Sequence, residues 1–302
     1  MTVAACALCP RRCGARREAL HGAGLCGMGT LPVVARAALH FGEEPCISGT
    51  RGSGTVFFCG CPLGCVFCQN SEISRGGGLG EALSVEALGA VFAALRAQGA
   101  HNINLVTASH FAPAVAQTLR RFPPGIPVVY NSSGYESPDT LRLLDGLVDV
   151  YLPDFKYADA ETARLCAAAP DYPEIALRAI AQMRRQSGPA VFDADGLLTR
   201  GTLVRHLVLP GLTGASMRAL SALRDTLPPD VRVSLMGQYT PYGAAKQIKG
   251  LDRPLLPREY RRVAAHLRAL GFDGYVQPPQ ATGTEMIPVW DRTGVEGMRG
   301  MP

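Results

Sequence analysis

The sequence lacks several features that would point to a membrane, to secretion or to a nucleic-acid partner. No run of about eighteen apolar residues occurs, which excludes an ordinary transmembrane helix. The start, MTVAACALCPRRC, has no long apolar stretch of the secretory type, so we expect a cytoplasmic protein that does not bind membranes. Lysine is scarce, with only three lysines among the thirty basic residues. The net charge of +5 permits an anionic partner without requiring one.

Cysteine, by contrast, is abundant and unevenly placed. Nine of the ten cysteines lie in the first 68 residues, in one group over residues 6–26 and a second over residues 46–68. In a protein expected to be cytoplasmic, this number argues against a disulfide framework and for metal or redox chemistry. The tenth, Cys166, stands alone in an alanine-rich helical stretch, where we expect a structural role.

From residue 55 onward, apolar β-type runs alternate with amphipathic stretches, which is the pattern of a parallel α/β fold. The expected strands lie at residues 55–61, 103–107, 127–131, 148–156, 202–210 and 232–239. The expected helices lie at residues 84–99, 112–122, 137–147, 172–186, 216–227 and 257–270, the first with a possible Ser84 cap. Six βα units with right-handed crossovers form an open barrel or a doubly wound sheet. In both, a site forms at the C-terminal ends of the strands.

The second cysteine group contains CPLGCVFC, in which Cys61, Cys65 and Cys68 have the spacing C-x3-C-x2-C at the end of the first expected strand. A structural zinc site takes four ligands, so here it would have to recruit Cys59 or a distant residue. An iron–sulfur cube held by three thiolates leaves one iron free to bind a small molecule. Cys59 precedes Cys61 by two strand positions and should share its face. For Cys59 and Cys46 we favour a buried apolar role.

These features resemble the radical S-adenosylmethionine superfamily. CPLGCVFC matches the cysteine motif of that family, including an aromatic residue, Phe67, directly before the last cysteine. The longer stretch EEPCISGTRGSGTVFFCGCPLGCVFCQN is similar to the branch that resembles pyruvate formate-lyase activating enzymes, and the resemblance covers roughly residues 40–275. It implies an α/β fold with a partial (βα)6 barrel of the radical S-adenosylmethionine type over residues 51–275. An N-terminal cysteine-rich extension over residues 1–50 and a tail over residues 276–302 would complete the chain.

The resemblance also implies the chemistry. In this family the three cysteines hold a [4Fe–4S] cluster, and its unique iron is chelated by the amino and carboxylate groups of S-adenosylmethionine. One electron, from a reductant such as flavodoxin or ferredoxin, breaks the sulfonium bond and yields methionine and a 5′-deoxyadenosyl radical, which abstracts hydrogen from a substrate. The chain is then an enzyme of the oxidoreductase or lyase class, with the cluster and S-adenosylmethionine as cofactors.

Polar residues at the expected strand ends fit such a cofactor. Asp154 and Lys156 lie two positions apart in YLPDFK, and the related activating enzymes contact S-adenosylmethionine through an aspartate and a lysine on the corresponding strand. The alternative for this pair is a surface ion pair at the barrel rim. Arg205 has a fork that suits carboxylate or ribose oxygens, and Asn131 can hydrogen-bond the methionine or ribose part. His206 points to the opposite face, as a core histidine does.

The second expected strand departs from the family. Many members have a Gly-Gly-Glu stretch there that binds the methionine amine, whereas this chain reads NINLVTASHF. Thr107 and Ser109 are the replacements we consider for those contacts. His110, Gln238 and Tyr239 are further candidates for the mouth of the site, each with a loop or core role as the alternative.

The first cysteine group, which we call the N-terminal module, has the spacing C-x2-C-x3-C-x12-C in Cys6, Cys9, Cys13 and Cys26. Four cysteines at such spacing, separated by prolines and glycines, indicate a metal site. The site is either a structural zinc site or an auxiliary iron–sulfur cluster that relays electrons or binds substrate. The interleaved arginines also allow nucleic-acid binding, although no stacking aromatic residues lie nearby.

Two classes of protein remain: a radical S-adenosylmethionine enzyme and a non-catalytic metal-binding protein on an α/β scaffold. The enzyme accounts for the thiols, the strand-end residues and the six units together, whereas the metal-binding protein accounts only for the cysteines. Activases of glycyl-radical enzymes typically carry Asp-Gly-Pro-Gly before their cysteines, where this chain has GTRGSGTVFF, and no ferredoxin-like insert follows Cys68. We therefore expect a small metabolite or a peptide side chain as substrate. The tail QPPQATGTEMIPVWDRTGVEG reads as an ordered loop.

Overall fold

The computed structural model describes residues 3–76, 78–277 and 287–298. Over these residues it contains a sheet of ten strands in the order β10-β9-β8-β6-β5-β4-β2-β1-β3, with β7 paired to β8. The strands that pair in parallel are β2 (Ser53–Phe58), β4 (Ile103–Val106), β5 (Val128–Ser132), β6 (Val150–Pro153), β8 (Leu198–Leu207), β9 (Arg232–Met236) and β10 (Gly274–Val276). The strands added antiparallel are β1 (Val33–His40), β3 (Glu81–Ala82) and β7 (Val191–Phe192).

The parallel strands follow one another across the sheet in chain order, without a reversal. Right-handed crossovers that never reverse place every connecting helix on the same face, so the sheet curls into an open barrel. A doubly wound sheet, which needs a reversal of strand order, is excluded. The six predicted βα units are confirmed, and β10 is a seventh parallel strand that the sequence did not indicate.

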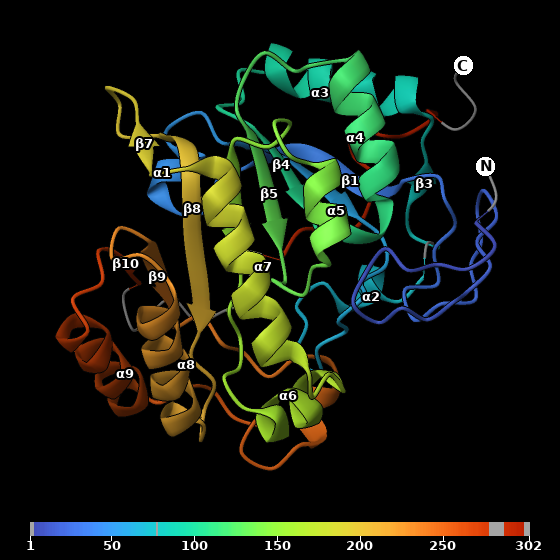
Figure 1. The fold of residues 1–302 in the computed structure, drawn as a ribbon. Helices are drawn as coiled ribbons and strands as arrows, with labels where there is room; N and C mark the ends of the chain where they lie inside the picture. The colour runs from blue at the N-terminus through green and yellow to red at the C-terminus, as the bar shows by residue number, and fades with distance from the viewer. Residues whose placement is uncertain (1–2, 77, 278–286, 299–302) are drawn as a thin grey trace.

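The long helices cover the outer face of this curved sheet (Figure 1). They are α3 (Val85–Ala97), α4 (Ala112–Arg121), α5 (Pro138–Leu143), α6 (Ala160–Ala167), α7 (Tyr172–Ser187), α8 (Thr213–Thr226) and α9 (Pro257–Ala269). The side chain of Ser84 accepts a hydrogen bond from the Ala87 amide, so the predicted cap of α3 is confirmed. No helix in the described part of the chain is both long and apolar enough to cross a bilayer.

The inner face of the sheet is filled from one side by α1 (Pro45–Ser48), a single turn between β1 and β2. Its Cys46 and Ile47 belong to one buried cluster with residues of β5, β6 and β8, such as Val129. Side chains two positions apart on a strand share a face, so Asn131 lies on this same inner face, one step nearer the C-terminal edge. The turn α1 therefore forms an apolar base beneath the polar strand ends.

The antiparallel strand β1 extends the sheet beyond β2 and is covered by a segment of the expected tail. The Ala37 amide donates to the Thr293 carbonyl at 2.8 Å, and the Arg292 amide donates to the Ala35 carbonyl at 3.1 Å. Of the tail expected as an ordered loop, residues 278–286 lie outside the described residues. The part from 287 to 298 thus runs along β1 through backbone hydrogen bonds.

Candidate functional site

The three motif cysteines lie on a loop that follows β2, which we call the cysteine loop (residues 59–70). The strand ends at Phe58, earlier than the predicted 61. Gly60 then turns the chain with φ 79°, and a Cβ there would lie 2.8 Å from the Cys26 carbonyl oxygen, so only glycine fits. The turn separates the fully buried Cys59 from Cys61, which lines a cavity. The expectation that these two cysteines share a face is therefore wrong.

One cavity of about 220 Å³ at the C-terminal edge of the parallel strands gathers most of the residues that the sequence singled out for the cluster and for S-adenosylmethionine. Nine of them line it: Cys61, Cys65, Cys68, Phe67, Thr107, Asn131, Asp154, Lys156 and Arg205. Gln238 lines it too, as expected for a residue at the mouth. Parallel strands end at the same edge, which is why residues so far apart in the chain meet here. We call this space the strand-end cavity.

The three cysteines of the motif are half-buried and line the strand-end cavity. The Tyr157 hydroxyl donates to the Cys65 sulfur at 3.7 Å. Burial raises the pKa of the Cys65 thiol. Burial, together with the two neighbouring thiols, also raises the pKa of Cys68 to about 12. These two thiols are therefore neutral at pH 7 and would lose their protons on binding a metal.

Asp154 stands between two cations just after β6. Its Oδ2 accepts from Lys156 Nζ at 2.6 Å and its Oδ1 accepts from Arg205 Nε at 3.0 Å. Burial alone would raise the pKa of Asp154, but Arg205 and Lys156 outweigh burial and hold that pKa below its usual range. The side chains of Asp154 and Lys156 are only 14% and 16% exposed, so the pair lies inside the cavity and not on an exposed rim.

A second carboxylate, Glu43, for which we had no prediction, holds the other side of Arg205. Its Oε2 accepts from Arg205 Nη1 at 3.0 Å, and its Oε1 accepts from the side-chain amides of Asn104 and Asn131, each at 3.0 Å. The Asn131 Oδ1 accepts in turn from Arg205 Nη2 at 2.5 Å. Asp154, Glu43 and Asn131 therefore fix the guanidinium from three sides with charge-assisted hydrogen bonds.

Glu44, the next residue, is buried beside this network. Its Oε2 has no hydrogen-bond partner within the described residues. Burial raises the pKa of Glu44, with Arg205 opposing and Glu43 reinforcing the rise. Lys156 and Arg205 are paired directly with Asp154 and Glu43, whereas Glu44 makes no ion pair within the described residues. The only signal for this acidic pair was the string EEP, which reads as an ordinary solvated helix start.

Three other candidates for the mouth or the amine contact do not line the strand-end cavity. Ser109, His110 and Tyr239 are buried and hydrogen-bonded elsewhere, so the core role holds for them. His206 faces away from Arg205 and is buried, as expected. The predicted burial of the remaining cysteines is confirmed, with exposures of 0–2% for Cys46, Cys59 and Cys166.

The N-terminal module packs against the cysteine loop. Arg11 of the module donates from Nε to the Pro62 carbonyl at 3.0 Å and from Nη2 to the Leu63 carbonyl at 3.2 Å. Its two other hydrogen bonds, at 2.6 and 2.8 Å, reach carbonyls around the C-terminal end of α6. Arg17, only 2% exposed, donates to the His110 carbonyl at 2.7 Å. The two cysteine groups are thus joined by direct contacts of the module with the loop and its surroundings.

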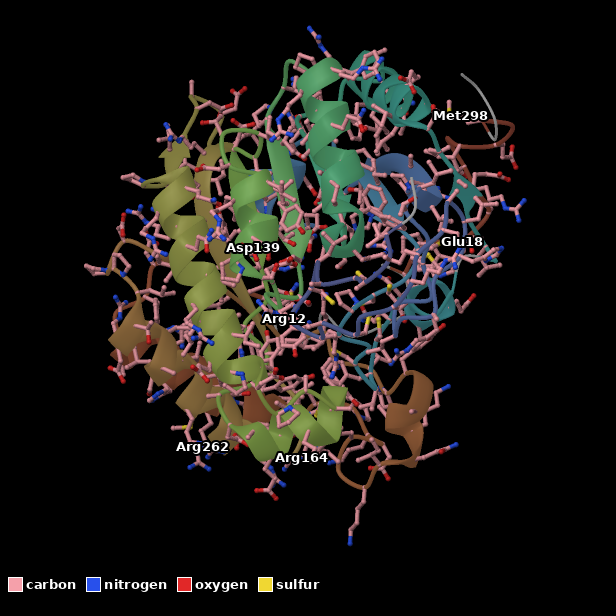
Figure 2. The ribbon with its side chains drawn as sticks, turned by 45° about the vertical axis from the view of Figure 1, so that its right-hand side comes forward. Arg12, Glu18, Asp139, Arg164, Arg262 and Met298 are labelled. Carbon is pink, nitrogen blue, oxygen red and sulfur yellow. The ribbon has the colours of Figure 1, made fainter. Side chains whose placement is uncertain are left out.

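Within the module, Cys6 and Cys9 are buried, Cys26 is half-buried and Cys13 is exposed. Figure 2 labels Arg12 and Glu18 of the module. Burial raises the pKa of Cys9 to about 11, with further upward contributions from Cys26 and Cys6. In the part of the chain that the structure describes, no three or more cysteine, histidine, aspartate or glutamate side chains form a ready site for a single metal ion. A metal at this module remains a prediction.

Residues 55–222 match the model of the Radical SAM superfamily. An uncharacterized protein of Methanocaldococcus jannaschii is 28% identical over 267 residues, which cover 85% of this chain and 72% of that protein. The structure of Streptococcus suis SuiB bound to precursor peptide SuiA aligns with a TM-score of 0.50 at 8% identity, over 72% of this chain. This chain spans 47% of SuiB, about half its length, and the likeness concerns the fold alone. A domain of a pyruvate-formate lyase-activating enzyme from Bacteroides vulgatus aligns with a TM-score of 0.40 at 13% identity, over 55% of this chain and 91% of that chain.

Proposed function

The chain belongs to the radical S-adenosylmethionine superfamily, and on that premise we propose that Cys61, Cys65 and Cys68 hold a [4Fe–4S] cluster and that the strand-end cavity binds S-adenosylmethionine. It is a radical S-adenosylmethionine enzyme, and the general reaction of the superfamily uses this cluster, S-adenosylmethionine and a one-electron reductant. The observation that carries the proposal is that one cavity brings the three thiols together with the polar ends of β4, β5, β6 and β8. A flavodoxin or a ferredoxin would be the electron donor.

The donors present fit the cluster. Three thiols from one loop line the cavity, and thiolate sulfur is the ligand that iron–sulfur clusters take. The neighbouring Cys59 is excluded from the cavity by the turn at Gly60. When bound, the cluster supplies the electron that cleaves the sulfonium bond of S-adenosylmethionine. The part of the protein is to bind and orient the reactants and to keep water away from them.

The charged groups of the cavity complement those of S-adenosylmethionine. Within the described residues the Lys156 ammonium donates only to Asp154, so it retains N–H donors for the carboxylate of the methionine part. Arg205 is held by three partners and acts mainly to position Asp154 and Asn131 and to supply positive charge. Asp154 suits the α-amino group, and the hydroxyl of Thr107 suits the ribose. Phe67, edge-on to the Tyr239 ring at 5.9 Å, provides an apolar wall.

The test removes the three thiols. Replacing Cys61, Cys65 and Cys68 with alanine should remove the iron and sulfide bound at the cysteine loop and abolish all formation of 5′-deoxyadenosine in anaerobically prepared protein. Cys59→Ala is the matched control, because it removes a nearby thiol that does not line the cavity. Turnover in the triple variant would overturn the proposal. Loss of metal from Cys59→Ala would instead favour the non-catalytic, four-cysteine site.

We propose further that the hydrogen atom comes from a small molecule or a peptide side chain, and not from a glycyl-radical enzyme of the formate-lyase type. The support is the stretch GTRGSGTVFF before the motif and the path of the chain after it. That path leads through α2 (Ser71–Ser74) and β3 directly into α3, with no cysteine-bearing insert. The reduced enzyme should give no glycyl doublet in the electron paramagnetic resonance spectrum of a purified glycyl-radical enzyme. A doublet that depends on this protein would restore the activase alternative.

The N-terminal module would hold a second metal, and both earlier alternatives stay open. Its contact with the cysteine loop through Arg11 supports a role tied to the cluster site, such as an auxiliary iron–sulfur cluster. A zinc ion would instead hold the module in the shape that presents Arg11 to the loop. Metal analysis separates the two, as set out in the Discussion.

A further inference from the structure

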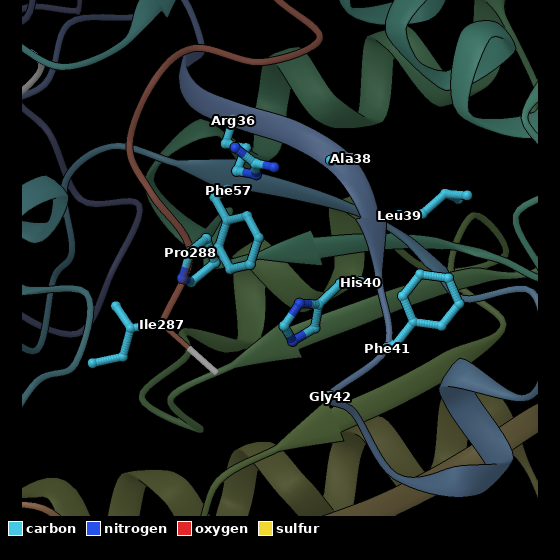
Figure 3. Close-up of a pocket in the computed structure, with 9 residues that line it drawn as sticks. All are labelled: Arg36, Ala38, Leu39, His40, Phe41, Gly42, Phe57, Ile287 and Pro288. Carbon is cyan, nitrogen blue, oxygen red and sulfur yellow. The ribbon is translucent and has the colours of Figure 1, made fainter. Parts of the chain in front are cut away.

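A second cavity, of about 310 Å³, opens beside the strand-end cavity along β1, and we call it the β1 chamber. Its inner wall consists of Arg36, Ala38 and His40 of β1 and Phe57 of β2, with Ile287 and Pro288 from the segment that crosses β1. Figure 3 shows the rings of His40 and Phe57 pointing into the same space beside Pro288. Its volume is at the lower end of the range of about 300–1,000 Å³ that small-molecule sites occupy.

The two cavities are adjacent. His40, Gly42, Phe57 and Pro288 line both of them. The β1 chamber lies toward the β1 side of the open sheet, while the strand-end cavity contains the thiols and the charged groups. A molecule in the chamber would therefore lie next to whatever occupies the strand-end cavity, without displacing it.

Arg36 is the one charged side chain among the described residues that line the β1 chamber, and it is paired with Asp291. Its Nη1 donates to the Asp291 carboxylate at 2.6 Å, to the Thr293 hydroxyl at 3.0 Å and to the Val289 carbonyl at 3.2 Å, so the positive charge is paired with a carboxylate. Burial, reinforced by the charge of Arg36, lowers the pKa of His40, so its imidazole is neutral at pH 7. A phosphate or carboxylate would have to compete with Asp291 for this guanidinium, and the described residues that line the chamber include no Asp or Glu for an amine.

The chamber does offer one polar contact and a set of ring surfaces. The half-buried imidazole of His40 makes no hydrogen bond within the described residues, so it has a donor and an acceptor to give. The ring of His40 lies edge-on to Phe57 at 6.0 Å, and Phe57 lies edge-on to Trp290 at 5.3 Å. Edge-to-face and offset contacts of this kind favour a further aromatic ring over a charged or hydrated group.

We propose that the β1 chamber is the substrate subsite and that it takes a neutral aromatic ring that carries one hydrogen-bonding group, such as a phenol, with that group on His40. This inference rests on the proposed function, because a substrate subsite requires the radical reaction to take place in the strand-end cavity. The strand-end cavity holds the charged reactant, and the chamber holds the uncharged group beside it in a space with little water. A neutral chamber suits hydrogen-atom abstraction, because the C–H bond of the substrate that loses its hydrogen atom carries no charge.

The test is direct binding of a probe to the anaerobically reconstituted enzyme. 4-Fluorophenol, neutral at pH 7, should show saturable broadening of its ¹⁹F resonance, and Ala38→Leu, which fills the chamber, should weaken this binding at least tenfold. His40→Leu should also weaken it several-fold, and this second variant keeps the test decisive if Ala38→Leu does not fold. Ala94→Leu, at an exposed position of α3, is the matched control and should bind as the wild type does.

Two further probes decide the chemical class. 4-Fluorobenzoate should bind at least tenfold more weakly than 4-fluorophenol, and cyclohexanol should fail to displace 4-fluorophenol at equal concentration. Tighter binding of the benzoate, equal competition by cyclohexanol, or unchanged affinity in both chamber variants would overturn the assignment. Cleavage of S-adenosylmethionine is measured separately as 5′-deoxyadenosine, so failure of the proposed function and failure of the chamber assignment give different results.

Discussion

Replacing Glu43 with glutamine should lower the free energy of unfolding by about 3 kcal/mol. The Glu43 and Arg205 side chains are only 10% and 13% exposed, so water cannot replace the lost charge. Glu43 accepts three hydrogen bonds through two oxygens, whereas glutamine has one acceptor oxygen and an NH₂ group that would face a donor. Breaking a buried ion pair costs about 3–5 kcal/mol, and we take the lower end because Asp154 and Asn131 still hold the guanidinium.

Scanning calorimetry of the reconstituted protein measures this loss. About 3 kcal/mol corresponds to a fall in Tm of about 6 °C for a large single domain. The control is Glu161→Gln, which removes the same charge from an exposed position of α6 with no ion pair in the described residues, and it should shift Tm by about 1 °C or less. A Glu43→Gln variant that melts within that same margin of the wild type would refute the view that Glu43 holds Arg205 in place.

The remaining predictions concern the cofactor, the module and pH. Lys156→Met should weaken S-adenosylmethionine binding about tenfold at unchanged iron content, since one charge-assisted hydrogen bond contributes about 1.5 kcal/mol or more. An unchanged affinity in a titration would mean that this lysine has a purely structural role. Arg11→Ala removes four hydrogen bonds to backbone carbonyls around the cysteine loop and should speed loss of iron in a chelator assay, whereas the exposed Arg12→Ala should not. Metal analysis of the variant without the three loop cysteines should still find metal at the N-terminal module. Iron with sulfide would indicate an auxiliary cluster, and zinc would indicate a structural site. An absence of metal would contradict the prediction made from the spacing of the four cysteines. Burial raises the pKa of Glu136 from 4.5 to about 7, so the folded state binds its proton more tightly. The contribution of Glu136 to stability is fully present below pH 4.5 and is lost, by roughly 3 kcal/mol, as the pH rises from 4.5 through 7. Glu136→Gln should flatten that decline in urea titrations at pH 5 and 8, and an equal slope in the variant would contradict it.

Most of the candidate site was predictable because its residues carry a local signature. The spacing of Cys61, Cys65 and Cys68 can be recognised from the sequence alone. Asp154 and Lys156 stand out because lysine is so rare in this chain. Strand periodicity then predicts that polar residues at successive strand ends meet at one edge. Errors appeared where the backbone turns abruptly: the same-face argument for Cys59 assumed that the strand continued past Phe58, and the positive φ of the next glycine ends it.

By itself, the sequence determined the alternation of strands and helices, the three-thiol motif and the four-cysteine module, because each depends on neighbours along the chain. Only the tertiary structure decided that Glu43 meets Arg205, 162 positions away, because that contact depends on α1 folding back against the inner face of the sheet. Only the tertiary structure likewise decided that Arg11 of the N-terminal module contacts the cysteine loop and that a chamber forms beside His40. A buried contact between distant segments carries no periodic signal, since any polar residue in a loop looks the same in sequence whether it faces water or an unpaired guanidinium.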